Sequence, residues 1–225
     1  MRLFQSTIGL KILMALSGLV GLGFVVGHML GNLQIFIPDD GQSLNDYAAA
    51  LHANAALLWV ARSVLLVSIV VHVVTVIKLN RKIKSARPIP YASKGWLGAS
   101  YATRSMRIGG YTLFAFIIYH LLHLTWGAQV LPEKNMATYM LDADHRDVYK
   151  NVVMGFKFYP TAFFYIIAQV MLGLHLTHGI HSISRTIGIS NPVWTERAGK
   201  AAVATGVGIT AGNIAIVLFG MFAGV

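Results

Sequence analysis

The sequence predicts an all-α integral membrane protein, a bundle of five transmembrane helices. The 225 residues are 56% hydrophobic and only 12% charged, whereas soluble domains carry about 25% charged residues. Apolar stretches of about 20 residues, long enough to cross about 30 Å of hydrocarbon, recur along the whole chain. We place the five helices in one membrane domain, residues 1–225, at about 12–37, 55–79, 108–131, 158–183 and 200–224.

Residues beside and within the predicted helices support their placement. The first follows Lys11, and it runs too long for a cleaved signal peptide and lacks a small-residue cleavage site after it. The second and third are separated by a basic loop, and the fourth ends just before Arg185. The fifth contains Gly208-xxx-Gly212, a spacing that permits close helix contact, so we expect it to serve packing or oligomer contacts.

The charges predict the orientation of the bundle. The amino-terminal segment and the loops after the second and fourth helices hold 13 of the 18 Lys and Arg residues, and the other two loops hold seven of the eight acids. Basic loops stay in the cytoplasm. We therefore expect a cytoplasmic amino terminus, a carboxy terminus outside, and a basic face that meets anionic lipid and a cytoplasmic protein partner. This one-sided distribution argues against nucleic-acid binding.

Four of the nine histidines, His28, His72, His120 and His175, each fall inside a different one of the first four helices. Histidine within the membrane is costly and usually faces the bundle interior, so it is a functional-site candidate. The chain has no cysteine, which excludes thiolate-ligated iron–sulfur clusters and c-type haem. Two bis-histidine haems b would use four such histidines. For any one of them, a helix–helix hydrogen bond or a proton relay is the alternative.

Depth suggests how the histidines pair. At 1.5 Å per residue, His28 and His120 lie about 25 and about 20 Å from the cytoplasmic surface, and His72 and His175 about 9 and about 15 Å. The first two therefore form an outer pair and the last two an inner pair. A weak repeat, Gly18 and Gly110 each ten residues before a histidine, favours His120 over His123. Depth alone matches His178 with His72 slightly better than His175, and the role of His181 stays open.

The chain resembles the membrane-anchor cytochrome b subunit of succinate dehydrogenase and fumarate reductase, in its five-helix, di-haem form. The likeness covers about residues 5–220, in Ser17-Gly18…Gly27-His28-Met29-Leu30, His72, Gly110…His120 and His175-Leu176-Thr177-His178-Gly179. It implies haem iron ligands His28 with His120 and His72 with His175. It also implies flavoprotein and iron–sulfur subunits on the cytoplasmic face, electron transfer to or from membrane quinone, often menaquinone, and the inner membrane of a prokaryote.

Two departures from the family leave the proton route and the quinone site unassigned. Some members have a glutamate shortly before the fourth-helix ligand, where this chain has Leu172, Gly173 and Leu174. A family glutamate on the outer side has no clear match either. The nearest protonatable groups there, which could equally be solvated loop residues, are Asp39, Asp40, Asp46 and His52.

Arg62 lies inside the second helix, about 15 Å outward of His72. A guanidinium at that depth needs an anion. We predict a haem propionate as that anion, and snorkelling to the outer head groups is the alternative. For the whole chain, the alternatives are a cytochrome b anchor of a hydrogenase or formate dehydrogenase, or a transporter that uses the histidines as proton relays.

Overall fold

Five long helices cross the molecule in the computed structural model, which describes residues 5–86, 89, 100–127, 139–142 and 145–224. Each is long and apolar enough to span a membrane. They are α1 (Thr7–Asn32), continued by the short η2 (Leu33–Phe36), α3 (Ala55–Ser85), α4 (Tyr101–His120), continued by the π-helical η3 (Leu121–Trp126), α6 (Tyr159–Thr186) and α7 (Pro192–Phe222). The predicted all-helical membrane class with five spans is confirmed.

Capping residues move several helix ends away from their predicted positions. The first, third and fifth helices begin five to eight residues earlier than predicted because Ser6, Ser100 and Asn191 cap them. The Ser6 hydroxyl, for example, accepts the Gly9 N–H at 2.9 Å. The second helix runs on to Ser85 through a basic stretch. Apolar composition marks the membrane-spanning part of a helix, whereas caps mark its true start. Residues 128–131 of the predicted third helix lie outside the described residues.

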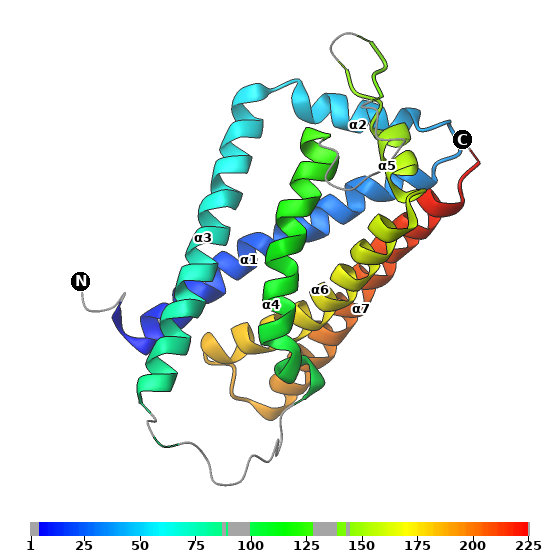
Figure 1. Cartoon of the computed structure of the whole chain (residues 1–225). Coiled ribbons are helices and arrows are strands. Elements are labelled where there is room, and N and C mark those ends of the chain that lie inside the picture. Colours follow the sequence, from blue (N-terminus) through cyan, green and yellow to red (C-terminus); the bar gives the residue numbers. More distant parts are fainter. Residues whose placement is uncertain (1–4, 87–88, 90–99, 128–138, 143–144, 225) are drawn as a thin grey trace.

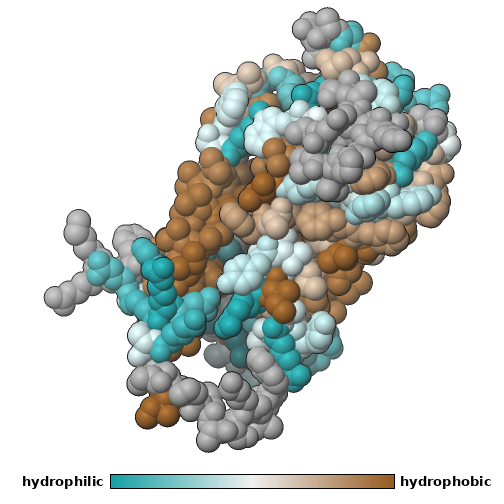
Figure 2. All heavy atoms as spheres, in the orientation of Figure 1, coloured by the Kyte–Doolittle hydropathy of each residue, from teal (hydrophilic) through white to brown (hydrophobic). Residues whose placement is uncertain are grey.

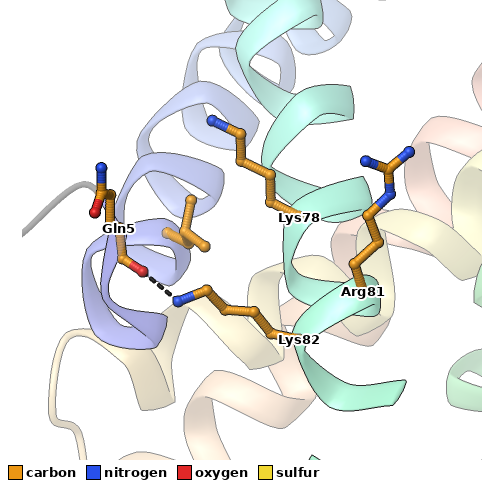
Figure 3. A pocket seen from close by; sticks show the side chains of 5 residues that line it. Gln5, Lys78, Arg81 and Lys82 are labelled. Carbon is orange, nitrogen blue, oxygen red and sulfur yellow. Dashed lines mark hydrogen bonds between the residues drawn. The ribbon is translucent and has the colours of Figure 1, made fainter. Parts of the chain in front are cut away.

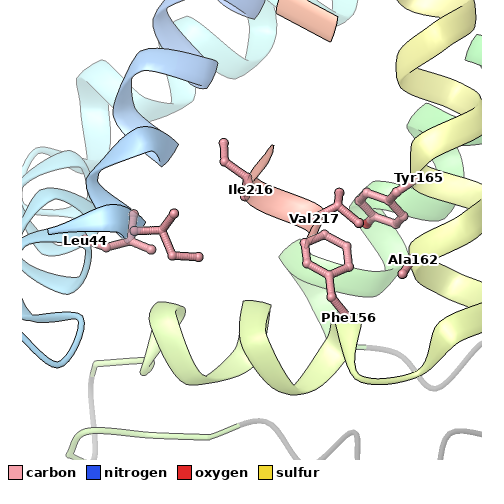
Figure 4. Close-up of a cluster of buried hydrophobic side chains, with 7 residues drawn as sticks. Leu44, Phe156, Ala162, Tyr165, Ile216 and Val217 are labelled. Carbon is pink, nitrogen blue, oxygen red and sulfur yellow. The ribbon is translucent and has the colours of Figure 1, made fainter. Parts of the chain in front are cut away.

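Two short helices, α2 (Gln42–His52) and α5 (Val148–Phe156), were not predicted. Figure 1 shows them together at the end of the bundle where α7 ends. Asn45 joins them, because its side chain donates to Asp147 at 3.2 Å and accepts the Tyr149 N–H at 3.1 Å. An apolar cluster at the same end links them to α6 and α7 (Figure 4); it comprises Ile35, Leu44, Phe156, Ala162, Tyr165, Ile216 and Val217.

The closest helix contact is between α6 and α7. A Cβ atom on Gly206 would lie 2.6 Å from the Gly173 carbonyl oxygen, so the two backbones touch there. Asn213 also donates to the Gln169 side chain across this contact at 2.8 Å. The predicted Gly208-xxx-Gly212 spacing is only partly used: Gly212 lies against Met29 of α1, but Gly208 has nothing within 4 Å among the described residues.

Helix α3 lies at the side of the bundle. Among the described residues it packs closely against α1 and, near its start, against α2. Many of its large apolar side chains are exposed, including Leu57, Trp59 and Leu66 at 64–66%. Figure 2 shows hydrophobic residues over the middle of the molecule and hydrophilic ones toward its two ends. Such a surface suits lipid, so the chain has the character of a multi-pass membrane protein.

Candidate functional site

The four intramembrane histidines meet in two pairs. The rings of His28 on α1 and His120 on α4 lie 5.8 Å apart between centroids, at an interplanar angle of 88°. Those of His72 on α3 and His175 on α6 lie 6.1 Å apart at 56°. The structure thus brings together the histidines that the resemblance pairs, at the outer and inner levels that depth arithmetic predicts. Their role as haem ligands stays a prediction.

Each pair joins two helices that do not pack closely against each other. Among the described residues, α1 packs on α3 and α4 packs on α6, whereas neither α1 with α4 nor α3 with α6 forms a close contact. The imidazoles therefore meet between helices that are not themselves in close contact, although α1 also packs on α6. A metal bound at about 2 Å by one nitrogen of each ring would hold the two ring centroids roughly 6 Å apart. Both observed separations agree with that geometry.

The surroundings of His72 leave one ring nitrogen for a metal. Its Nδ1 lies 3.3 Å from the Met14 carbonyl oxygen, to which it donates, and 3.4 Å from the Ser17 hydroxyl. A Cβ atom on Gly18 would lie 3.5 Å from the same ring. Metal-bound histidines commonly donate their other N–H to a backbone carbonyl in this way. Gly18, which lies ten residues before His28 in the repeat, therefore contacts His72, as does Ser17, while Gly110 has nothing within 4 Å among the described residues.

His175 and His28 have different surroundings. The Nδ1 atom of His175 is buried and has no hydrogen-bond partner among the described residues, an arrangement that is rare for a buried polar atom. The Nε2 atom of His28 lies 3.1 Å from the Asn32 side-chain nitrogen and accepts a hydrogen bond from it. A metal at this Nε2 requires the ring to release Asn32.

The remaining histidines have other partners. His178, which depth arithmetic alone slightly favoured, has its Nδ1 3.1 Å from the Thr103 hydroxyl of α4, whereas His175 faces His72. His123 is 1% exposed, with its Nδ1 2.8 Å from the Tyr165 hydroxyl. That hydroxyl also lies 3.3 Å from Nδ1 of His120. Tyr165 could not be identified from the sequence, because nothing in the pattern of the fourth helix shows that this tyrosine faces the third helix.

Arg62 stacks on an aromatic ring. Its guanidinium carbon lies 5.2 Å from the ring centre of Trp59, one turn earlier on α3. Both residues are exposed, and such cation–π contacts contribute about 0.5–1 kcal/mol at exposed sites. The predicted propionate contact stays a prediction.

Asp39 and His52 have local structural partners near the start and end of α2. The Asp39 carboxylate accepts hydrogen bonds from the Ser43 hydroxyl at 2.5 Å and from the backbone N–H groups of Ser43 and Gly41. These bonds, chiefly that of the Ser43 hydroxyl, lower the pKa of Asp39 below its usual value. His52 donates from Nδ1 to the Ala48 carbonyl at 2.8 Å. Asp39 therefore has a structural role at the start of α2, where its carboxylate accepts these hydrogen bonds.

A basic pocket of about 350 Å³ lies where α1 begins and α3 ends (Figure 3). Lys78, Arg81 and Lys82 line it together with Gln5 and Leu10, and Lys82 donates to the Gln5 carbonyl oxygen. Figure 1 places this end opposite α2 and α5. Asp39 and Asp147, beside α2 and α5, therefore lie at the opposite end of the bundle from this basic pocket, and the orientation in the membrane stays a prediction.

Comparison with known proteins assigns no family to this chain. No protein-family model, no curated protein and no solved structure matches it. The functional proposal therefore depends on the two histidine pairs and on the motifs in the sequence.

Proposed function

We propose that the chain is the membrane-anchor cytochrome b subunit of a succinate:quinone oxidoreductase. It would pass electrons between a cytoplasmic flavin and iron–sulfur dehydrogenase and membrane quinone, which is often menaquinone in the di-haem group. Two haems b would sit within the bundle, the outer one between His28 and His120 and the inner one between His72 and His175. The chain itself would carry out no succinate chemistry.

The observation that carries this proposal is the meeting of four intramembrane imidazoles in two pairs, at 5.8 and 6.1 Å. A helix-to-helix hydrogen bond between histidines would draw the two helices together, yet the helices joined by each pair do not pack closely among the described residues. A bis-histidine haem requires two imidazoles that bind one iron, and both observed separations leave room for a single metal ion between the rings.

The chain's own residues would hold and tune the two centres. Haem b, when bound, supplies a one-electron iron couple whose potential depends on its ligands and surroundings. The four histidines fix the positions of the centres on separate helices. Met14 orients His72 through its carbonyl oxygen, and Tyr165 lies beside His120. The apolar helices around them keep water away, and a low dielectric strengthens every charge interaction inside the bundle.

The basic end supports docking of the dehydrogenase there. Lys78, Arg81 and Lys82 gather beside the start of α1, and none of the described residues that line their pocket is acidic. Under the positive-inside rule this end faces the cytoplasm. The electron-donating subunits would then approach the inner pair, since His72 lies six residues before Lys78 on the same helix.

Haem content tests the proposal directly. We expect a pyridine haemochrome assay on the full chain, purified from membranes, to give two haems b per polypeptide, because each histidine pair would hold one. A reduced-minus-oxidised spectrum should show b-type bands. One haem or none per chain would contradict the assignment, and a spectrum without haem bands would favour the transporter alternative. Co-purification of a flavoprotein, as opposed to a nickel or molybdenum protein, separates a succinate dehydrogenase anchor from those of hydrogenases and formate dehydrogenases.

Replacing Arg62 tests the predicted propionate contact. We expect Arg62→Leu to lower the midpoint potential of the outer haem by tens of millivolts, since removing a nearby positive charge disfavours the reduced, less positive iron. A redox titration followed at the haem bands measures this. Trp59→Leu, which removes only the stacking partner seen in the structure, is the matched control. Unchanged potentials in Arg62→Leu would leave Arg62 as a membrane-surface residue stacked on Trp59.

A further inference from the structure

A single tyrosine hydroxyl lies between two histidines at the outer pair. The Tyr165 oxygen is 3.3 Å from Nδ1 of His120 and 2.8 Å from Nδ1 of His123. Tyr165 is 3% exposed and His123 only 1%. His120 belongs to the outer pair, whereas His123 is a member of neither pair. The proposed function so far assigns no role to this second buried imidazole.

Neighbouring rings fix the positions of both groups. Tyr119 stacks on His123, with 5.5 Å between centroids and 20° between planes. Phe116 and Phe156 meet the Tyr165 ring edge-on, each at 4.9 Å between centroids. Beside His123, a Cβ atom on Gly155 would lie 2.8 Å from its Nε2. Close packing of this kind restricts rotation of the side chains, so the hydroxyl is held between the two nitrogens.

Chemistry sets the direction of the two hydrogen bonds, and here the inference rests on the proposed function. If Nε2 of His120 binds iron, its Nδ1 carries the proton and donates to the Tyr165 oxygen. A phenol has one proton to donate, so Tyr165 donates it to Nδ1 of His123. The result is a series of two hydrogen bonds with a fixed direction: His120 donates to Tyr165, and Tyr165 donates to His123.

We propose that Tyr165, supported by His123, is a positioning residue for the outer haem ligand: it fixes the tautomer and ring orientation of His120 and increases the basicity of its Nε2. A more basic ligand favours the oxidised iron. The inner ligand His72 donates instead to a backbone carbonyl, that of Met14. The two centres therefore have different hydrogen-bond partners, and a substitution at Tyr165 alters the partner of the outer ligand alone.

Tyr165→Phe in the full chain tests this proposal, because it removes the hydroxyl and keeps the ring. Redox titration of the haem bands should show the reduction equilibrium of the outer centre shifted about tenfold toward the reduced form, which is about 59 mV for one electron. The inner centre should not move. The outer centre is identified as the one missing from His120→Ala. Selective loss of the outer haem would also support the proposal, since metal affinity depends on such partners.

Two further variants complete the experiment. Tyr119→Phe is the matched control, because it removes a neighbouring hydroxyl, which bonds to Thr161 at 2.6 Å, and keeps the ring that stacks on His123; both potentials should stay as in the unaltered chain. His123→Gln changes the acceptor of the Tyr165 hydrogen bond while Tyr165 is intact, and should move the outer potential in the same direction as Tyr165→Phe, but less. If Tyr165→Phe does not fold, the potential of His123→Gln tests the role of Tyr165 instead. Unchanged potentials, or equal shifts at both centres, would overturn the role of Tyr165. Absence of haem from the unaltered chain would instead overturn the proposed function.

Discussion

Replacing His175 by alanine is expected to remove one of two haems and to leave the other in place. His175 faces His72 across the space between α6 and α3, so under the proposed function the inner centre loses a ligand that no other residue in the pair can replace. Haem content should fall from two per chain to one. His72→Ala should give the same result, and its remaining spectrum should match that of His175→Ala, because both variants would keep only the outer centre.

His178→Ala is the matched control for this experiment. His178 lies three residues further along the same helix, but its ring contacts Thr103 and not His72. We expect the variant to retain both haems. If His178→Ala lost the inner haem while His175→Ala kept it, the pairing seen in the structure would be the wrong one. If His175→Ala lost both centres equally, the separation into two independent sites would have no support.

Adding one methyl group at Gly206 is expected to destabilise the whole bundle. The Cβ atom of Gly206→Ala would lie 2.6 Å from the Gly173 carbonyl oxygen and also meet the Thr177 hydroxyl. Backbone cannot move aside as a side chain can, so α6 and α7 must separate. Overpacking of this kind costs about 1–3 kcal/mol or more. Thermal unfolding in detergent, followed by tryptophan fluorescence, should show a lower midpoint.

Gly208→Ala provides the comparison on the same helix. Gly208 has nothing within 4 Å among the described residues, and alanine is favoured over glycine within a helix by about 1 kcal/mol. This variant should be as stable as the unaltered chain or more so. Equal stability of Gly206→Ala and Gly208→Ala would mean that the α6–α7 contact is looser than the structure shows.

The five spans could be predicted from sequence because the bilayer imposes a minimum apolar length on every crossing helix. Helices α2 and α5 fall below that length, and their cues are local: Asp39 and Asp147 accept backbone N–H groups near their starts. A search for long apolar stretches passes over such helices. Ser6 and Ser100 could have placed two helix starts correctly, since serine before a helical stretch is a capping signal.

The outer and inner levels of the histidines were predictable because rise per residue fixes depth along each helix. The rotation of each helix about its axis, which decides which histidine faces which, was not predictable. The choice between His175 and His178 depends on which face of α6 meets α3, and Tyr165 enters the site for the same reason. Glycines show the same limit: the Gly208-xxx-Gly212 spacing is visible in the sequence, but the contact that matters joins Gly206 to Gly173 of another helix. Such a pairing depends on how two helices cross, which one chain's sequence pattern does not reveal.

Helix α3 carries His72, yet among the described residues it packs closely on α1 and, near its own start, on α2 alone. Under the proposed function, the inner haem would then link this peripheral helix to α6 through His72 and His175. During assembly, the five helices would insert first, and binding of the inner haem would then fix α3 in its place. A cell starved of haem would accumulate chains with one loosely held helix, open to quality-control proteases.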